Sequence, residues 1–165
     1  MRIGLLSDTH SVLAPAYKAI EAMGEIDLLI HCGDHYRDAS KIAASINVPV
    51  HAVVGNCDSR MDGPAEKLLD LEGVLIYVTH GHRYNVKSSL LSLYYRALEL
   101  KASVAVFGHT HVEGFGYTRA PGCPNSQKLL IINPGSISDP RGGDRLSYGI
   151  LEIEGSVVRP EIHYL

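Results

Sequence analysis

The sequence predicts an α/β fold in which two β-sheets pack together and helices cover the outside. Residues 2–55 alternate short apolar runs with helical segments, and such a βαβ pattern is typical of a parallel sheet. From residue 112 onward, short alternating segments broken by Gly, Pro, Asn and Asp indicate hairpins. The length of 165 residues with 45% hydrophobic content suits one domain, residues 1–165.

The first half of the chain supplies three buried strands and two helices. Apolar runs at 2–7, 26–33 and 48–55 are predicted strands. Segment 13–23 has apolar positions at helical spacing with Pro15 in its first turn, and segment 38–46 is a second predicted helix.

The second half begins with a strand at 72–81, a helix at 88–100 and a strand at 102–108. Hairpin segments follow at 112–119, 127–135, 146–155 and 156–165, and residues 122–126 (GCPNS) form a predicted exposed hairpin tip. Tyr94-Tyr95 on the helix could mark a surface contact in a homo-oligomer, although aromatic residues at that spacing are more often core.

Composition excludes several classes of protein. A net charge of -3 argues against stable nucleic-acid binding, which favours a basic face. The three cysteines, Cys32, Cys57 and Cys123, form no disulfide framework and fit a reducing compartment. Because no stretch resembles a signal peptide or a membrane span, we expect a cytoplasmic protein.

Each predicted buried strand before residue 112 ends in a polar cluster. The clusters are Asp8-x-His10, Gly33-Asp34, Gly55-Asn56-x-Asp58, Thr79-His80-Gly81-His82 and Gly108-His109-x-His111. Ligands in open α/β sheets bind beyond the carboxyl ends of the strands, so these side chains are expected to converge. Alternation places residues i and i+2 on one face for as long as the strand lasts.

Carboxylate, amide and imidazole groups together suit a metal site with oxygen and nitrogen ligands. Any one cluster could instead be a turn former or helix cap, and a lone histidine is more often structural. Five successive strand ends with ligand-type side chains favour the metal site, and glycines there allow close backbone approach.

In this order, the five clusters resemble those of the calcineurin-like metallophosphoesterase superfamily, in its compact bacterial and archaeal phosphodiesterase branch. The resemblance implies a four-layer α/β/β/α sandwich and two divalent metal ions. One ion is expected on Asp8, His10 and His111, the other on Asn56, His80 and His109, with Asp34 bridging both. The implied reaction is in-line attack on phosphorus by a metal-bridging hydroxide.

Cys57 departs from the pattern, because many superfamily members have His at this position and use it to protonate the leaving group. A thiol is a poor proton donor near neutral pH, so we expect Cys57 to pack beside the site without chemistry. Asp58 is expected to orient the neighbouring residues. His82 or a metal-bound water is the hypothetical general acid.

The expected activity is hydrolysis of a small phosphodiester, with phosphomonoesters or dinucleoside polyphosphates as alternative substrates. Mn²⁺ is the first choice of metal, although Ni²⁺, Fe, Zn²⁺, Co²⁺ or Mg²⁺ also suit the ligands. Two alternative functions are a protein-binding scaffold, like the retromer subunit of the same fold, and a Cys-based phosphatase. Intact ligand clusters argue against the scaffold, and the missing phosphate loop argues against the phosphatase.

Overall fold

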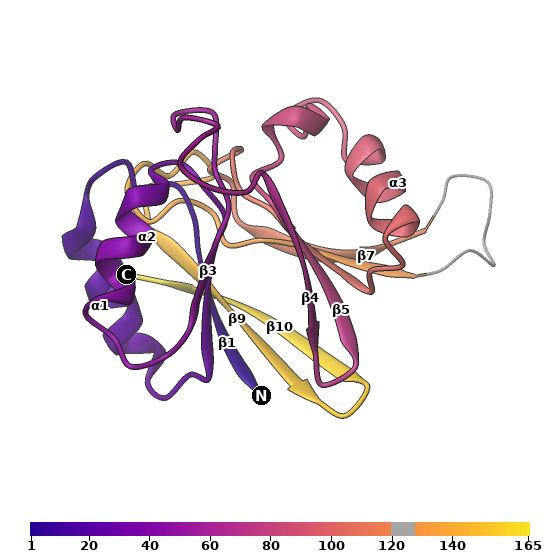
Figure 1. Ribbon diagram of the computed structural model, residues 1–165, viewed down its shortest axis with the longest axis horizontal. Helices are drawn as coiled ribbons and strands as arrows, with labels where there is room; N and C mark the ends of the chain where they lie inside the picture. Colours follow the sequence, from indigo (N-terminus) through magenta and orange to yellow (C-terminus); the bar gives the residue numbers. More distant parts are fainter. Residues whose placement is uncertain (120–127) are drawn as a thin grey trace.

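The computed structural model describes residues 1–119 and 128–165, and it contains two five-stranded sheets packed face to face (Figure 1). The predicted hairpin tip at 122–126 and Cys123 lie outside these residues. The sheet orders are β10-β9-β1-β2-β3 and β4-β5-β6-β8-β7. In chain order, the elements are β1 (Arg2–Leu6), α1 (Leu13–Met23), β2 (Leu28–His31), α2 (Tyr36–Ala43), β3 (Val50–Ala52), β4 (Glu66–Leu71), β5 (Val74–Thr79), the 3₁₀ turn η1 (His82–Tyr84), α3 (Leu91–Glu99), β6 (Val104–Val106), β7 (Gly114–Thr118), β8 (Leu129–Asn133), β9 (Ser147–Glu154) and β10 (Val157–Tyr164).

Strand alternation explains the layers of the first sheet. In β1, Ile3 and Leu5 belong to the core between the sheets, whereas Leu6 belongs to the layer under α1 and α2. Ala16 and Ala19 are the fully buried α1 residues in that layer, and their small side chains let the helix approach the sheet. The two helices therefore cover one outer face (Figure 1).

The second sheet follows the same rule with α3 on its outer face (Figure 1). Ile132 in β8 faces the other sheet, whereas Ile131 packs with Leu93 and Tyr94 of α3. Tyr94 is core at 2% exposure, whereas Tyr95 is 48% exposed. The four-layer α/β/β/α arrangement is thus confirmed. Separately, no helix in the described segments has the length and apolar character needed to cross a bilayer.

Two features of the chain differ from the predictions. Strand β4 was not predicted, because in EKLLDL (66–71) the adjacent Leu68 and Leu69 break the alternation of a half-buried strand. Only Leu69 and Leu71 pack on the core. The predicted helices 38–46 and 88–100 span Tyr36–Ala43 and Leu91–Glu99, since helix ends are poorly marked here by capping side chains.

Both sheets direct parallel strands to the same edge of the sandwich. In the first sheet β1, β2 and β3 are parallel, and in the second β5, β6 and β8 are parallel. All five polar clusters follow one of these strands, so the fold brings them to one edge from two different sheets. We call it the ligand edge.

Candidate metal centre

Four side chains of the ligand edge converge on one point. Among the described residues, those whose ligand atoms all lie within 4.8 Å of one another are Asp8, His10, Asp34 and His111. Asp8 and Asp34 follow two neighbouring strands of the first sheet, and His111 follows β6 of the second. The group therefore spans the seam between the two sheets, and no single strand could supply it.

The backbone at these positions is left-handed, which was not predicted. The φ angles are 56° at Asp8, 44° at His10, 55° at Asp34, 68° at His109 and 59° at His111. Strand β1 ends at Leu6 and β6 at Val106, so strand alternation does not align these pairs. Tight turns that cost roughly 1 kcal/mol per residue aim the side chains instead.

Several polar atoms at the convergence point lie within 3.3 Å of a neighbouring polar atom. Asp8 is fully buried, and its Oδ1 atom makes no hydrogen bond although Nε2 of His111 lies 3.2 Å away. The Nε2 atoms of His10 and His111 are 3.3 Å apart, and Nδ1–H of His111 donates to the carbonyl of Asp139. His111 therefore directs Nε2 at the cluster, where hydrogen bonding to Asp8 raises the pKa of the imidazole and a cation would take the place of the proton.

A second group lies on the other side of Asp34. Nε2 of His80 is 3.4 Å from Oδ1 of Asp34 and 3.2 Å from Oδ1 of Asn56. Nδ1–H of His80 donates to the carbonyl of Cys32, so Nε2 faces Asp34 and Asn56. Burial lowers the pKa of His80, but hydrogen bonding to Asp34 and the charges of Asp8 and Asp34 outweigh it and raise that pKa, and a cation would take the place of the Nε2 proton. Asp34 thus offers one carboxylate oxygen to each group, as a bridging ligand requires.

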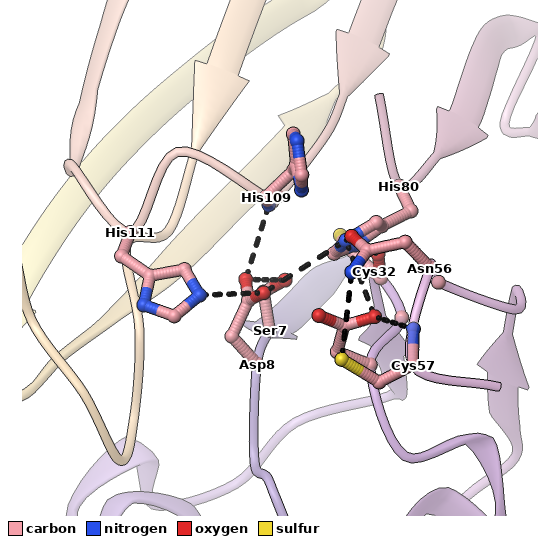
Figure 2. A network of polar contacts seen from close by, with 12 residues as sticks. Ser7, Asp8, Cys32, Asn56, Cys57, His80, His109 and His111 are labelled. Atoms are coloured by element: carbon pink, nitrogen blue, oxygen red, sulfur yellow. Dashed lines mark hydrogen bonds and ion pairs between the residues drawn. The ribbon is translucent and has the colours of Figure 1, made fainter. Parts of the chain in front are cut away.

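His109 is placed less tightly than the sequence suggests. Its ring centroid is 5.0 Å from that of His80, and its side chain is absent from the four-residue group. The backbone N–H of His109 donates to Oδ2 of Asp8 over 3.2 Å, and this contact is drawn in Figure 2. The imidazole would have to approach His80 and Asn56 to complete a second metal site.

The charge states suit cation binding. Burial alone would raise the pKa of Asp34, but hydrogen bonding with His80 and the N–H of Cys57 hold it well below its usual range. Burial, together with the positive charges of His80 and Lys87, lowers the pKa of His109 to about 4. At neutral pH Asp34 is therefore ionised and His109 is neutral, whereas the carboxylates raise the pKa of His80 and His111.

Two glycines make room for the carboxylates. A Cβ atom at Gly55 would lie 2.0 Å from Oδ1 of Asp34 and 2.4 Å from its backbone nitrogen. At Gly108 it would lie 2.0 Å from Oγ of Ser7 and 2.9 Å from Oδ2 of Asp8. The expected close backbone approach at these positions is confirmed.

Supporting contacts that the sequence did not reveal hold the Asp8 turn. The hydroxyls of Ser136 and Ser138 both donate to the carbonyl of Asp8. Deeper in the fold, buried His31 contacts Thr9, whose hydroxyl donates to the carboxylate of Asp38. Ser136 ends the run NPGS (133–136), and only its position after a third parallel strand could have suggested this role.

Cys57 is not the buried space-filler that was expected, because its side chain is exposed at the mouth of the site. Loss of hydration and the neighbouring Asp34 carboxylate raise the pKa of its thiol to about 11. Its backbone N–H donates to Oδ1 of Asp34. The backbone turn at residues 55–58, rather than the thiol, is what the site uses.

Asp58 and His82 lie beside the site. The two oxygens of Asp58 accept the N–H groups of Tyr36 and Gly55, so this carboxylate ties the third loop to the start of α2. His82 lies in η1, with its ring 5.3 Å from that of His80, and its buried Nδ1 has no hydrogen-bond partner. Neither residue lines the hollow above the metal-ligand group.

That hollow has a volume of about 350 Å³ and opens to solvent. Besides the ligands, its wall includes Cys57, Lys87, Asp139 and Arg141. Lys87 carries no sequence signal, because a lone lysine before a helix is ordinary. Arg141 lines the hollow together with Lys87.

Comparison with known proteins agrees with this geometry. Residues 1–156 match the calcineurin-like phosphoesterase superfamily domain. A probable metallophosphoesterase of Bacillus subtilis, YsnB, is 41% identical over 93% of this chain and 85% of its own. The phosphodiesterase YfcE of Escherichia coli is 29% identical over 92% and 88%. The crystal structure of a predicted phosphoesterase from Streptococcus pneumoniae superposes with a TM-score of 0.79 at 28% identity. The match covers 99% of this chain and 88% of that one.

Proposed function

The chain belongs to the calcineurin-like phosphoesterase superfamily, and we propose that it is a binuclear metal-dependent phosphodiesterase. One observation carries the proposal. The ligand atoms of Asp8, His10 and His111 on one side of Asp34, and of Asn56 and His80 on the other, face one another at 3.2–3.9 Å, and Oδ1 of buried Asp8 has no hydrogen-bond partner among the described residues. Such an arrangement is costly unless cations occupy it.

When bound, the two divalent ions would supply a hydroxide nucleophile near neutral pH and polarise the phosphoryl oxygens. The residues of this chain do the positioning. Asp8, His10 and His111 would hold one ion and Asn56, His80 and His109 the other, with Asp34 between. Mn²⁺ is our first choice, because the mixed oxygen and nitrogen set suits it.

We propose that the protein has no strong general acid of its own. A thiol with a pKa of about 11 is a weak proton donor, so Cys57 stays a bystander. Burial, followed by the charge of His80, lowers the pKa of His82, and a neutral imidazole is also a poor acid. Esters with good leaving groups should therefore react fastest. If His82 does protonate the leaving group, His82→Ala slows poor leaving groups selectively.

The test is hydrolysis of bis(4-nitrophenyl) phosphate and of 4-nitrophenyl phosphate by protein stripped of metal and then titrated with each divalent ion. Diester turnover should appear with Mn²⁺ and disappear in Asp34→Asn. Asp70→Asn is the matched control, since Asp70 lies in the β4–β5 hairpin at the opposite end of β5.

Three results would contradict the proposal. Faster cleavage of the monoester at every ion would favour a phosphomonoesterase. Tight metal binding without turnover of any ester would favour a scaffold, and near-normal rates in Asp34→Asn would remove the bridging role.

A further inference from the structure

An apolar groove lies beside the metal centre, on the outer face of the second sheet where α3 does not reach. Its volume is about 350 Å³. Most of its lining is apolar and includes Leu90, Phe107, Val112, Gly114, Phe115, Gly116, Tyr117 and Ile131, whereas Glu113, Thr118 and Asn133 form its polar part. We call this hollow the apolar groove. Leu90 and Val112 remain 39% and 44% exposed, so the groove is open to a ligand.

The groove exists because strand β7 carries glycine where side chains would fill it. Phe115 and Tyr117 pair with Ile132 and Leu130, which face the core between the sheets. Gly114 and Gly116 therefore face the opposite side, where Ile131 lies. A Cβ atom at Gly116 would meet nothing within 4 Å, and its φ is outside the left-handed region.

The groove and the hollow of the metal centre each share lining residues with a third hollow. An intermediate hollow shares Leu90, Phe107 and Val112 with the groove. It shares Lys87 and Arg141 with the metal centre. Lys87 is near enough to lower the pKa of His109, and the backbone N–H of Arg141 donates to the carbonyl of His111.

Outward from the metal ligands, the path first passes Lys87 and Arg141, the latter 3.7 Å from the carboxylate of Asp139, and then reaches the mainly apolar wall beside Glu113. A phosphate anion would bind between the metal ligands and the side chains of Lys87 and Arg141. An uncharged part of the substrate would extend past these two side chains into the apolar groove. A phosphomonoester with a small alcohol would leave the apolar wall empty. A phosphodiester has a second ester arm that can reach it.

We propose that the apolar groove binds the non-leaving arm of a phosphodiester substrate and selects for an aryl or similarly apolar group there. Lys87 and Arg141 bind the non-bridging oxygens of the same phosphate. This inference rests on the proposed phosphodiesterase function and names the class of its substrate. Partial burial of a phenyl ring contributes enough to favour the aryl ester by about tenfold.

Two diesters that share the leaving group 4-nitrophenolate test the role of the groove: phenyl 4-nitrophenyl phosphate and methyl 4-nitrophenyl phosphate. With the metal-loaded protein, kcat/KM should be about tenfold higher for the phenyl ester after division by the uncatalysed rates. Gly116→Phe fills the groove and Leu90→Ser removes apolar wall, so both should lower this ratio at least about threefold. Val157→Ser, an equally exposed apolar site in the β9–β10 hairpin, should leave the ratio unchanged.

A binding measurement separates this inference from the proposed function. In the Zn²⁺-loaded protein, diphenyl phosphate should shift the methyl NMR signals of Leu90 and Val112, whereas dimethyl phosphate should not. Shifts without hydrolysis of any ester would reject the phosphodiesterase but support the groove. Hydrolysis of both esters at equal normalised rates, with no shifts, would overturn the groove and leave the phosphodiesterase standing.

The other occupant to test is a second copy of the chain. Sedimentation equilibrium should give the same mass for the wild-type protein and for Gly116→Phe. A wild-type dimer that Gly116→Phe dissociates would mean that the groove is an interface between copies, and would overturn the inference.

Discussion

Buried Ile, Leu and Val side chains on regular strands fill the space between the two sheets. The ligand edge, by contrast, gathers buried carboxylates and imidazoles on left-handed backbone. Seven non-glycine residues there have positive φ: Asp8, His10, Ser11, Asp34, His35, His109 and His111. The space between the sheets stabilises the fold, whereas the ligand edge adopts strained backbone that lowers stability but orients the side chains.

Gly55→Ala should give the largest functional effect. The added methyl would collide with the carboxylate of Asp34 and with its backbone nitrogen, which cannot move aside. Metal affinity should fall by about a hundredfold, as measured by titration calorimetry with Mn²⁺. Gly143→Ala is the matched control, because its methyl would point into open space. Equal affinity in the two variants would show that the ligand edge tolerates displacement.

Ile30→Ala probes the other region. Ile30 is fully buried between the sheets, and its truncation should lower the free energy of unfolding by about 3 kcal/mol. Urea unfolding measures this change. Metal affinity of the folded variant should stay within about threefold of wild type, because the metal ligands are held by contacts that do not involve Ile30. If Ile30→Ala also weakened metal binding by much more than threefold, the two regions would not be separable.

His31 lies between the two regions and should make stability depend on pH. Burial lowers the pKa of His31 to about 4, although Asp8 and Asp38 oppose the shift. Because the unfolded chain takes up this proton near pH 6.5 and the folded chain only near pH 4, the unfolded state binds more protons in between. Stability of the metal-free protein should therefore fall as pH falls from 6.5 to 4, by up to about 3 kcal/mol.

Chemical denaturation at several pH values follows this loss, and His31→Gln should flatten the curve. His163→Gln, at an exposed histidine paired with Glu161, should leave the curve unchanged. If His31→Gln kept the wild-type slope, the buried imidazole would not be its source.

Ser11→Gly should give the smallest effect and the opposite sign. Ser11 has a φ of 65° and is exposed, so glycine should relieve strain and raise the free energy of unfolding by about 0.5 kcal/mol. Ser103→Gly, where φ is not positive, should lower stability by about as much. Thermal unfolding of both proteins decides the matter, and a loss of stability in Ser11→Gly would show that the turn is not strained.

The two regions also differ in how well the sequence predicts them. Apolar alternation in segments such as 2–7 and 72–81 is set by burial on one face, so the layers could be predicted. Strand β4 could not, because adjacent leucines obscure its alternation. At the ligand edge, residue types and order predicted the convergence of Asp8, His10, Asp34 and His111, but not its cause. Left-handed turns depend on contacts from distant segments, such as Ser136 and Ser138 on Asp8.

Surface features were the least predictable part. Lys87 and Arg141 gain meaning only from their position between the metal centre and the apolar groove. The exposure of Cys57 depends on how residues 55–58 turn, and thiols in short loops carry no pattern that reveals this.

Anomalous X-ray diffraction from crystals grown with Mn²⁺ tests the metal centre most directly. Two peaks about 3.5–4 Å apart should appear. One should lie among Asp8, His10 and His111 and the other beside Asn56 and His80, with Asp34 between them. A single peak, or peaks away from the ligand edge at saturating Mn²⁺, would contradict the binuclear site.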